Sequence, residues 1–282
     1  MRYQLLFILI IPFLLVSGCK KTENKVVDIL KSEDFINLQY GTHTSQTLDL
    51  YLPENRTSET RVIIFVHGGS WLNGDKSELT ELATTFRDKG YATASVNYRL
   101  SRTTENNVYP AQLDDLENAV KFISNKSQEW EVSGELFSLL GVSAGGHLGM
   151  LYTYARNADN KIKTVISLAG PTDLLTLHNT SAQHAQVVQG FLGTNPQSNA
   201  AIYQQASPVG YVKSSSKPSL LFHGKLDVVV PYQQSLSLKA RLDGVSVKNK
   251  LVTYENLSHE ADLNLVPGFI SECENWLDEN FK

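Results

Sequence analysis

Short apolar runs alternate with amphipathic segments along most of this chain. Residues 61–69 (RVIIFVHGG) form a continuous apolar run that ends in glycines, which is typical of a buried central strand. Residues 35–41 and 47–53 have the character of an antiparallel opening pair. Further strands are expected at residues 91–100, 136–143, 163–170, 218–225 and 249–256.

Segments with helical periodicity separate these strands. Ser77 can cap a helix whose apolar residues repeat with helical spacing, and Gly90 can end it. Pro110 opens a second helix, a third covers about residues 145–156, and the last begins at Pro267. Strands that alternate with helices of crossover length predict an α/β fold, with a mostly parallel sheet of eight strands and helices on both faces.

The alternation lapses between about residues 171 and 218. This segment is rich in Gln, Asn and Ser, and its apolar residues form only short clusters such as Val187–Val188 and Phe191–Leu192. A long insertion after a late strand is a common place for a lid, so we expect a small lid here. An ordinary surface excursion is the alternative.

The first residues have the character of a secretory signal. Arg2 precedes an apolar run that ends at Val16, shorter than the roughly 20 residues that cross a membrane. The sequence VSGC resembles the lipobox of bacterial lipoproteins, which implies cleavage before Cys19 and lipidation of its thiol. A plain anchor helix, or a signal cleaved elsewhere, is the alternative.

The lipobox divides the chain into three parts. We expect a signal peptide at residues 1–18, a polar tether at 19–33 and one folded domain at 34–282. Several acyl chains on Cys19 would hold the domain stably at a membrane. The predicted location is therefore the bacterial cell envelope, on its periplasmic or extracellular face.

Composition and charge narrow the function classes. The 282 residues are 41% hydrophobic and 19% charged, and the formal net charge is −4. The chain has no basic patch, which argues against nucleic acid as a partner. Cys273 has apolar neighbours at helical spacing and is expected to be a buried core thiol. No zinc-ligand spacing occurs, and we expect neither a metal nor a cofactor.

The sequence Gly141-Val142-Ser143-Ala144-Gly145 matches the pattern G-x-S-x-G. The pattern alone is weakly specific, but here an expected strand precedes it and an expected helix follows it. Such a strand–turn–helix presents the Ser143 hydroxyl at the C-terminal edge of the sheet, where open α/β sheets bind their ligands. Ser143 is therefore a candidate nucleophile.

A serine nucleophile needs a base, and the base needs an acid to orient it. His259 lies in a polar loop after the last expected strand, and Asp227 follows the strand before it. The order serine, aspartate, histidine predicts a catalytic triad of Ser143, Asp227 and His259. Asp173, which also follows a strand end, is the alternative acid.

An oxyanion formed at Ser143 would also need hydrogen-bond donors. In the sequence HGGSW, the glycines allow backbone N–H groups to approach a ligand closely. The N–H groups of Gly68, Gly69 and Ala144 are the candidate oxyanion hole, although a simple glycine turn is the alternative. His67 within this motif, and His147 in the following helix, are expected to have structural roles.

Several motifs together resemble the α/β-hydrolase superfamily, in its esterase and lipase branch with an HGG motif. They are HGGSW…GDK, NYRL, YPAQLDD, GVSAGGHLG, HGKLDVVVP and the late SH, spread over residues 34–282. The branch includes carboxylesterases and bifunctional feruloyl and acetyl-xylan esterases. The resemblance implies the same triad and oxyanion donors as above. Ser70 departs from the pattern, because the family often has a third glycine there.

The predicted function is hydrolysis of carboxylic esters through an acyl-enzyme, on short-chain esters or on acetyl or feruloyl esters of carbohydrates. An amide-directed hydrolase, such as a formamidase or peptidase, is an alternative because an amide can use the same triad. A catalytically dead binding lipoprotein on the same scaffold, or a polysaccharide-binding surface lipoprotein, is another.

A few further residues have open assignments. Ser70 and Trp71 are candidates for the substrate pocket, with core packing as the alternative for Trp71. His178 and His184 are expected at the surface of the insertion rather than against substrate. Arg99 is expected to form a structural ion pair with Asp114 or Asp115.

Overall fold

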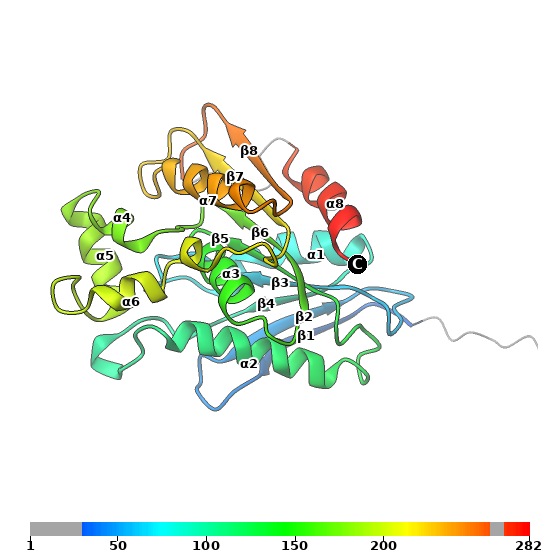
Figure 1. Ribbon diagram of the computed structural model, residues 1–282. Helices are drawn as coiled ribbons and strands as arrows, with labels where there is room; N and C mark the ends of the chain where they lie inside the picture. Colours follow the sequence, from blue (N-terminus) through cyan, green and yellow to red (C-terminus); the bar gives the residue numbers. More distant parts are fainter. Residues whose placement is uncertain (1–29, 260–267) are drawn as a thin grey trace, which may run out of the picture.

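A single mixed sheet forms the centre of the protein (Figure 1), as a computed structural model of residues 30–259 and 268–282 describes it. The strand β2 (Thr47–Leu52) is antiparallel to both of its neighbours, and all other pairs of neighbouring strands are parallel. This arrangement confirms the predicted α/β-hydrolase fold. In sheet order the eight strands are β1 (Glu33–Gln39), β2 (Thr47–Leu52), β4 (Ala92–Val96), β3 (Val62–Val66), β5 (Phe137–Val142), β6 (Ile162–Leu168), β7 (Ser219–Gly224) and β8 (Asn249–Tyr254).

The central strands are apolar on both faces because helices cover both faces of the sheet. Along β3, Val62, Ile64 and Val66 enter one core cluster, whereas Ile63 and Phe65 enter the other. The edge strand β1 is largely exposed. Burial on two faces therefore explains the continuous apolar runs that predicted the strands.

Five helices of the described ranges form the two outer layers. The first core cluster includes buried residues of α2 (Ala111–Lys126), α3 (Ala144–Ala155) and α7 (Gln233–Gly244). The second includes buried residues of α1 (Thr80–Asp88) and α8 (Phe269–Asn280). Cys273 lies fully buried in α8, as predicted, and burial raises the pKa of its thiol.

The predicted cap at Ser77 is wrong. A short 3₁₀ helix, η1 (Lys76–Leu79), precedes α1, and its N-cap is Asp75. The Asp75 carboxylate accepts a hydrogen bond from the Ser77 N–H, and Glu78 bonds back to the Asp75 N–H, which completes a capping box. A carboxylate two residues earlier thus takes the role that we assigned to the Ser77 hydroxyl.

The insertion between β6 and β7 folds into three short helices, which lie together on one side of the molecule in Figure 1. Ser101 Oγ donates to the Gly190 carbonyl at 2.8 Å, and Tyr109 N–H donates to the Phe191 carbonyl at 2.9 Å. These bonds attach the insertion to the body of the domain; its role as a lid stays a prediction. The helices are α4 (Leu174–His178), α5 (Ala182–Leu192) and α6 (Ala200–Gln205), and the 3₁₀ helix η3 (Pro208–Tyr211) follows.

The predicted signal peptide, Cys19 and most of the tether lie outside the described residues. Within the described ranges, every helix is too short or too polar to cross a membrane.

Candidate active site

The predicted nucleophile lies in a sharp turn between β5 and α3. Ser143 has φ 52° and ψ −119°, a backbone conformation that costs a non-glycine residue free energy. A Cβ atom on Gly141 would come within 3.0 Å of the Gly145 backbone, and one on Gly145 would come equally close to the carbonyl of Val66. Both glycines of G-x-S-x-G are therefore required because the turn packs directly on the backbone of β3 and α3.

This packing predicts a stability loss for Gly145→Ala. We expect its free energy of unfolding to fall by about 3 kcal/mol, because the new methyl group overpacks rigid backbone. Gly149→Ala is the matched control in the same helix, since a Cβ there meets no atom closer than 3.5 Å. Urea titration followed by circular dichroism measures both variants. Equal stabilities would contradict the packing described here.

The structure brings the three predicted triad residues together. His259 Nε2 lies 2.9 Å from Ser143 Oγ, and His259 Nδ1 lies 2.6 Å from Asp227 Oδ2. A carboxylate can only accept, so Nδ1 carries the proton and Nε2 accepts from the serine hydroxyl. The alternative acid, Asp173, instead caps α4 by accepting from the Thr176 N–H. Asp173 therefore takes no part in the hydrogen bonds that join Ser143, His259 and Asp227.

The carboxylate of Asp227 is buried and held by several donors. Its Oδ1 accepts from the N–H groups of Val229 and Val230, at 2.9 and 2.8 Å. Its Oδ2 lies 3.2 Å from His223 Nε2 in addition to His259. Burial alone would raise the pKa of Asp227, but the hydrogen bonds from His223, His259 and Val230 outweigh it and hold the pKa below its usual range. Asp227 is therefore ionised at neutral pH.

The candidate oxyanion donors lie next to the serine. A Cβ on Gly68 would lie 3.4 Å from Ser143 Cβ, so the Gly68 backbone passes directly beside the nucleophile. Gly69 has φ 91°, and a Cβ there would come within 3.0 Å of the Asn73 carbonyl. Ala144 is the first residue of α3, where backbone N–H groups point outward without a helical partner. The geometry therefore fits the assigned role, which stays a prediction.

The two histidines beside the nucleophile are structural, as predicted. His67 is buried, its ring stacks on Tyr98 with centroids 4.4 Å apart, and burial lowers its pKa. His147 is also fully buried; its Nδ1 accepts from Trp71 Nε1 at 3.1 Å, and its Nε2 donates to the Ala206 carbonyl. Burial lowers the pKa of His147 to about 4, so it is neutral at pH 7.

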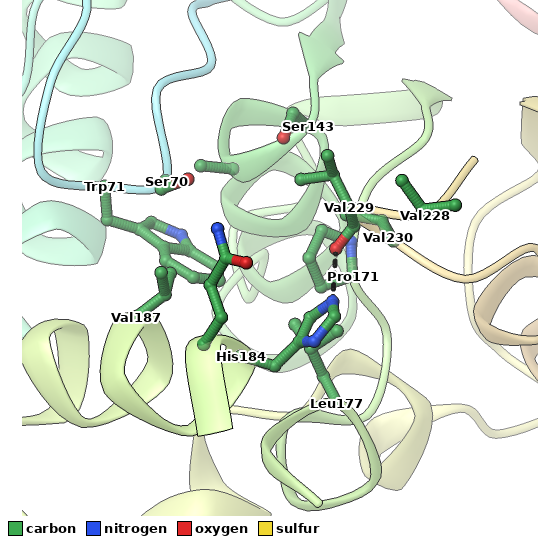
Figure 2. A pocket seen from close by; sticks show the side chains of 12 residues that line it. Ser70, Trp71, Ser143, Pro171, Leu177, His184, Val187, Val228, Val229 and Val230 are labelled. Carbon is green, nitrogen blue, oxygen red and sulfur yellow. Dashed lines mark hydrogen bonds between the residues drawn. The ribbon is translucent and has the colours of Figure 1, made fainter. Parts of the chain in front are cut away.

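An apolar pocket of about 240 Å³ opens at Ser143. In Figure 2, Trp71 and Val187 lie on one flank, and Val229 and Val230 on the other. Trp71 is both a pocket residue and a core residue, because its buried ring stacks on Phe191. The lining residues are Ser70, Trp71, Ser143, Ala144, Pro171, Leu177, Gln183, His184, Val187, Val228, Val229 and Val230.

The expectation that both insertion histidines lie at the surface is wrong for His184. This residue is half-buried and lines the pocket, and its Nε2 lies 3.0 Å from the carbonyl oxygen of Val229 (Figure 2). His184 thus connects α5 to the loop that carries Asp227. His178, also half-buried, packs instead against Tyr203. No local pattern distinguishes these two histidines, because α5 reaches the pocket only through tertiary packing.

The predicted ion pair of Arg99 is structural. Arg99 binds the buried carboxylate of Asp115, with Nη2 2.6 Å from Oδ1. Asp114 pairs with Arg156 instead.

A family model and several curated proteins match the sequence of this chain. The model of the BD-FAE family matches residues 48–242. Esterase LipQ of Mycobacterium tuberculosis is 26% identical over 216 residues, which cover 72% of this chain and 50% of that protein. Isoprenylcysteine alpha-carbonyl methylesterase ICME of Arabidopsis thaliana is 24% identical over 79% of this chain and 56% of its own length. The chain thus spans about half the length of these curated relatives.

Solved structures share the fold over most of the chain. A truncated carbohydrate esterase from gut microbiota superposes with a TM-score of 0.77 at 20% identity, covering 88% of this chain and 95% of that one. An acetyl ester-xyloside bifunctional hydrolase from Caldicellulosiruptor lactoaceticus gives 0.70 at 21% identity, covering 83% and 88%. At 20% and 21% sequence identity, these superpositions show that the chains share a fold.

Proposed function

The chain belongs to the BD-FAE family of α/β-hydrolase esterases, and on this basis we propose that it hydrolyses carboxylic esters through an acyl-enzyme on Ser143. The observation that carries the proposal is the line of hydrogen bonds from Ser143 through His259 to Asp227, at the mouth of an apolar pocket. The esterase relatives support the same reaction class.

In the proposed mechanism, His259 Nε2 takes the hydroxyl proton as Ser143 Oγ attacks the ester carbonyl carbon. The carbonyl oxygen becomes an oxyanion, which accepts hydrogen bonds from the N–H groups of Gly68, Gly69 and Ala144. Asp227 stabilises the imidazolium and keeps its ring oriented.

Collapse of the intermediate then breaks the bond to the alkoxy oxygen. His259 returns its proton to that oxygen, and the alcohol leaves. A water molecule then attacks the acyl carbon while His259 takes its proton. When this second intermediate collapses, the bond to Ser143 Oγ breaks, His259 returns the proton to Oγ, and the acid is released.

We propose that the substrates are either short-chain esters or esters that link an acetyl or feruloyl group to a carbohydrate. The small volume of the pocket supports a short group, and its apolar lining suits an acyl chain or ring. The carbohydrate esterases among the similar structures are consistent with a sugar-linked ester.

The small volume of the pocket predicts that His184→Ala changes the preference for acyl-chain length. The His184 side chain forms part of the pocket wall, so its removal makes room for additional methylene groups. We expect the ratio of kcat/KM for p-nitrophenyl octanoate to that for the acetate to rise roughly tenfold, within the range that one or two methylenes contribute in an apolar pocket.

His178→Ala is the matched control, because His178 lies in the same insertion but packs against Tyr203. Its octanoate-to-acetate ratio should stay at the wild-type value. An unchanged ratio in His184→Ala, or an equal rise in both variants, would contradict the assignment of His184 to the pocket wall.

The function itself is tested by initial rates on a panel of substrates: p-nitrophenyl acetate, butyrate and octanoate, methyl ferulate, acetylated xylan and an N-formyl amide. We expect turnover of short-chain esters that is lost in Ser143→Ala. Preferred turnover of the amide would indicate an amide hydrolase. No turnover, together with a serine that does not react with a fluorophosphonate, would indicate a binding protein.

We propose in addition that Cys19 is lipidated and holds the domain on the cell envelope. The lipobox-like sequence VSGC supports this. The test is expression of the full chain in bacteria grown with labelled palmitate. Label and membrane association in the wild type, both lost in Cys19→Ser, would support the anchor. Wild-type protein without label would refute it.

A further inference from the structure

A second histidine, His223, contacts the carboxylate of Asp227. It is the fifth residue of β7, and its side chain is fully buried. Its Nε2 lies 3.2 Å from Asp227 Oδ2, the same oxygen that accepts from His259 Nδ1 at 2.6 Å. The acidic group of the site therefore lies between two imidazole rings.

The partners of His223 determine which of its nitrogens carries the proton. Nε2 lies 2.8 Å from the carbonyl oxygen of Val230, and a carbonyl can only accept, so Nε2 is the donor. Nδ1 lies 2.7 Å from Ser235 Oγ, and in the neutral ring it accepts from that hydroxyl. The Nε2–H group thus donates to the Val230 carbonyl, and the Asp227 carboxylate lies 3.2 Å from the same nitrogen.

We propose that His223 is a positioning residue that holds Asp227 in line with His259, a role that rests on the proposed ester hydrolysis. It extends the line of polar contacts to Ser235–His223–Asp227–His259–Ser143, in which the His223–Asp227 contact is 3.2 Å long.

The other contacts of the carboxylate explain why this donor matters. Oδ1 is held by the N–H groups of Val229 and Val230, which belong to the same loop as Asp227 and so do not fix that loop to another element. His223 is on β7, which pairs with a strand on each side, so its contact ties the loop to the sheet. Because its Nε2–H also binds the Val230 carbonyl, the same side chain fixes a wall of the substrate pocket.

Two amide substitutions separate the contacts of His223. The side chain of His223→Gln can place an N–H group near the former Nε2, and so keeps a donor to Asp227 while losing the bond to Ser235. The shorter side chain of His223→Asn reaches only the former Nδ1 position, and so keeps Ser235 and loses Asp227. Both replace the ring by an amide, so a general cost of losing the imidazole falls on both.

The experiment compares kcat and KM for p-nitrophenyl acetate in the wild type and both variants. We expect His223→Asn to lower kcat roughly 10- to 100-fold, the cost of a misplaced catalytic group, with little change in KM. His223→Gln should recover most of this loss. Leu221→Ala, on the same face of β7, controls for lost core packing and should keep the wild-type kcat.

Wild-type kcat in a folded His223→Asn, or equal losses in the Asn and Gln variants, would overturn the proposal. If His223→Asn does not fold, His223→Phe takes its place: it keeps a ring of similar size without a donor, so its kcat must fall well below that of His223→Gln, and equal kcat values in the two variants would overturn the proposal. Failure of the proposed function is distinct, since the wild-type protein would then show no turnover at all.

Discussion

Ser143→Ala is expected to lower kcat for p-nitrophenyl acetate about 10⁴- to 10⁶-fold, as removal of the nucleophile does in serine hydrolases. The substitution deletes one oxygen and leaves the apolar pocket and the oxyanion donors in place. KM for the residual activity should therefore change little. Steady-state rates measured on protein free of contaminating esterase check this result.

The control measurement is the stability of the folded variant. Ser143 has a positive φ, which Ala tolerates no better than Ser, so the substitution relieves no backbone strain. We expect the urea midpoint of Ser143→Ala to stay close to the wild-type value. A variant that is fully folded and retains more than a few per cent of the wild-type kcat would refute Ser143 as the nucleophile.

Asp227→Asn should lower kcat by about 10⁴-fold, the loss seen when the acid of a serine-protease triad becomes an amide. The carboxylate of Asp227 accepts from Val229, Val230 and His259 and faces Nε2 of His223. In Asp227→Asn, an NH₂ group replaces one carboxylate oxygen, so its two hydrogens face some of the groups that donate to the carboxylate. The His259 ring is then favoured in the wrong tautomer, with its proton on the nitrogen that faces Ser143.

Asp173→Asn is the matched control for this charge removal. Asp173 is the other aspartate that follows a strand end, and it caps α4. Asn is as good a cap as Asp, so both stability and kcat should stay near the wild-type values. Loss of activity in Asp173→Asn, with activity retained in Asp227→Asn, would reverse the assignment of the acid.

Sequence alone located the residues whose structural role requires a recognisable pattern in the neighbouring residues. The apolar run at residues 61–69 marks β3 because that strand is buried on both faces. Gly141 and Gly145 mark the turn around Ser143 because only glycine fits against the backbone there. Asp227 and His259 follow from chain order, because parallel strands end at one edge of the sheet.

The features that the sequence did not reveal depend on partners far away in the chain. Helix α7 was not anticipated, because its segment QQSLSLKARLDG is mostly polar. His184 reaches the pocket only because α5 packs beside the Val229 loop. His223 is the exception: it occurs four residues before Asp227 in HGKLD, at the end of a strand, and this spacing could have indicated a contact.

Covalent labelling of the wild-type protein tests the central claim most directly. The protein is incubated with a fluorophosphonate, digested and analysed by mass spectrometry. The proposed acyl-enzyme predicts about one equivalent of label, on the peptide that contains Ser143, with slow labelling in His259→Ala and none in Ser143→Ala. Label on another residue, or an unlabelled Ser143 in folded wild-type protein, would contradict it.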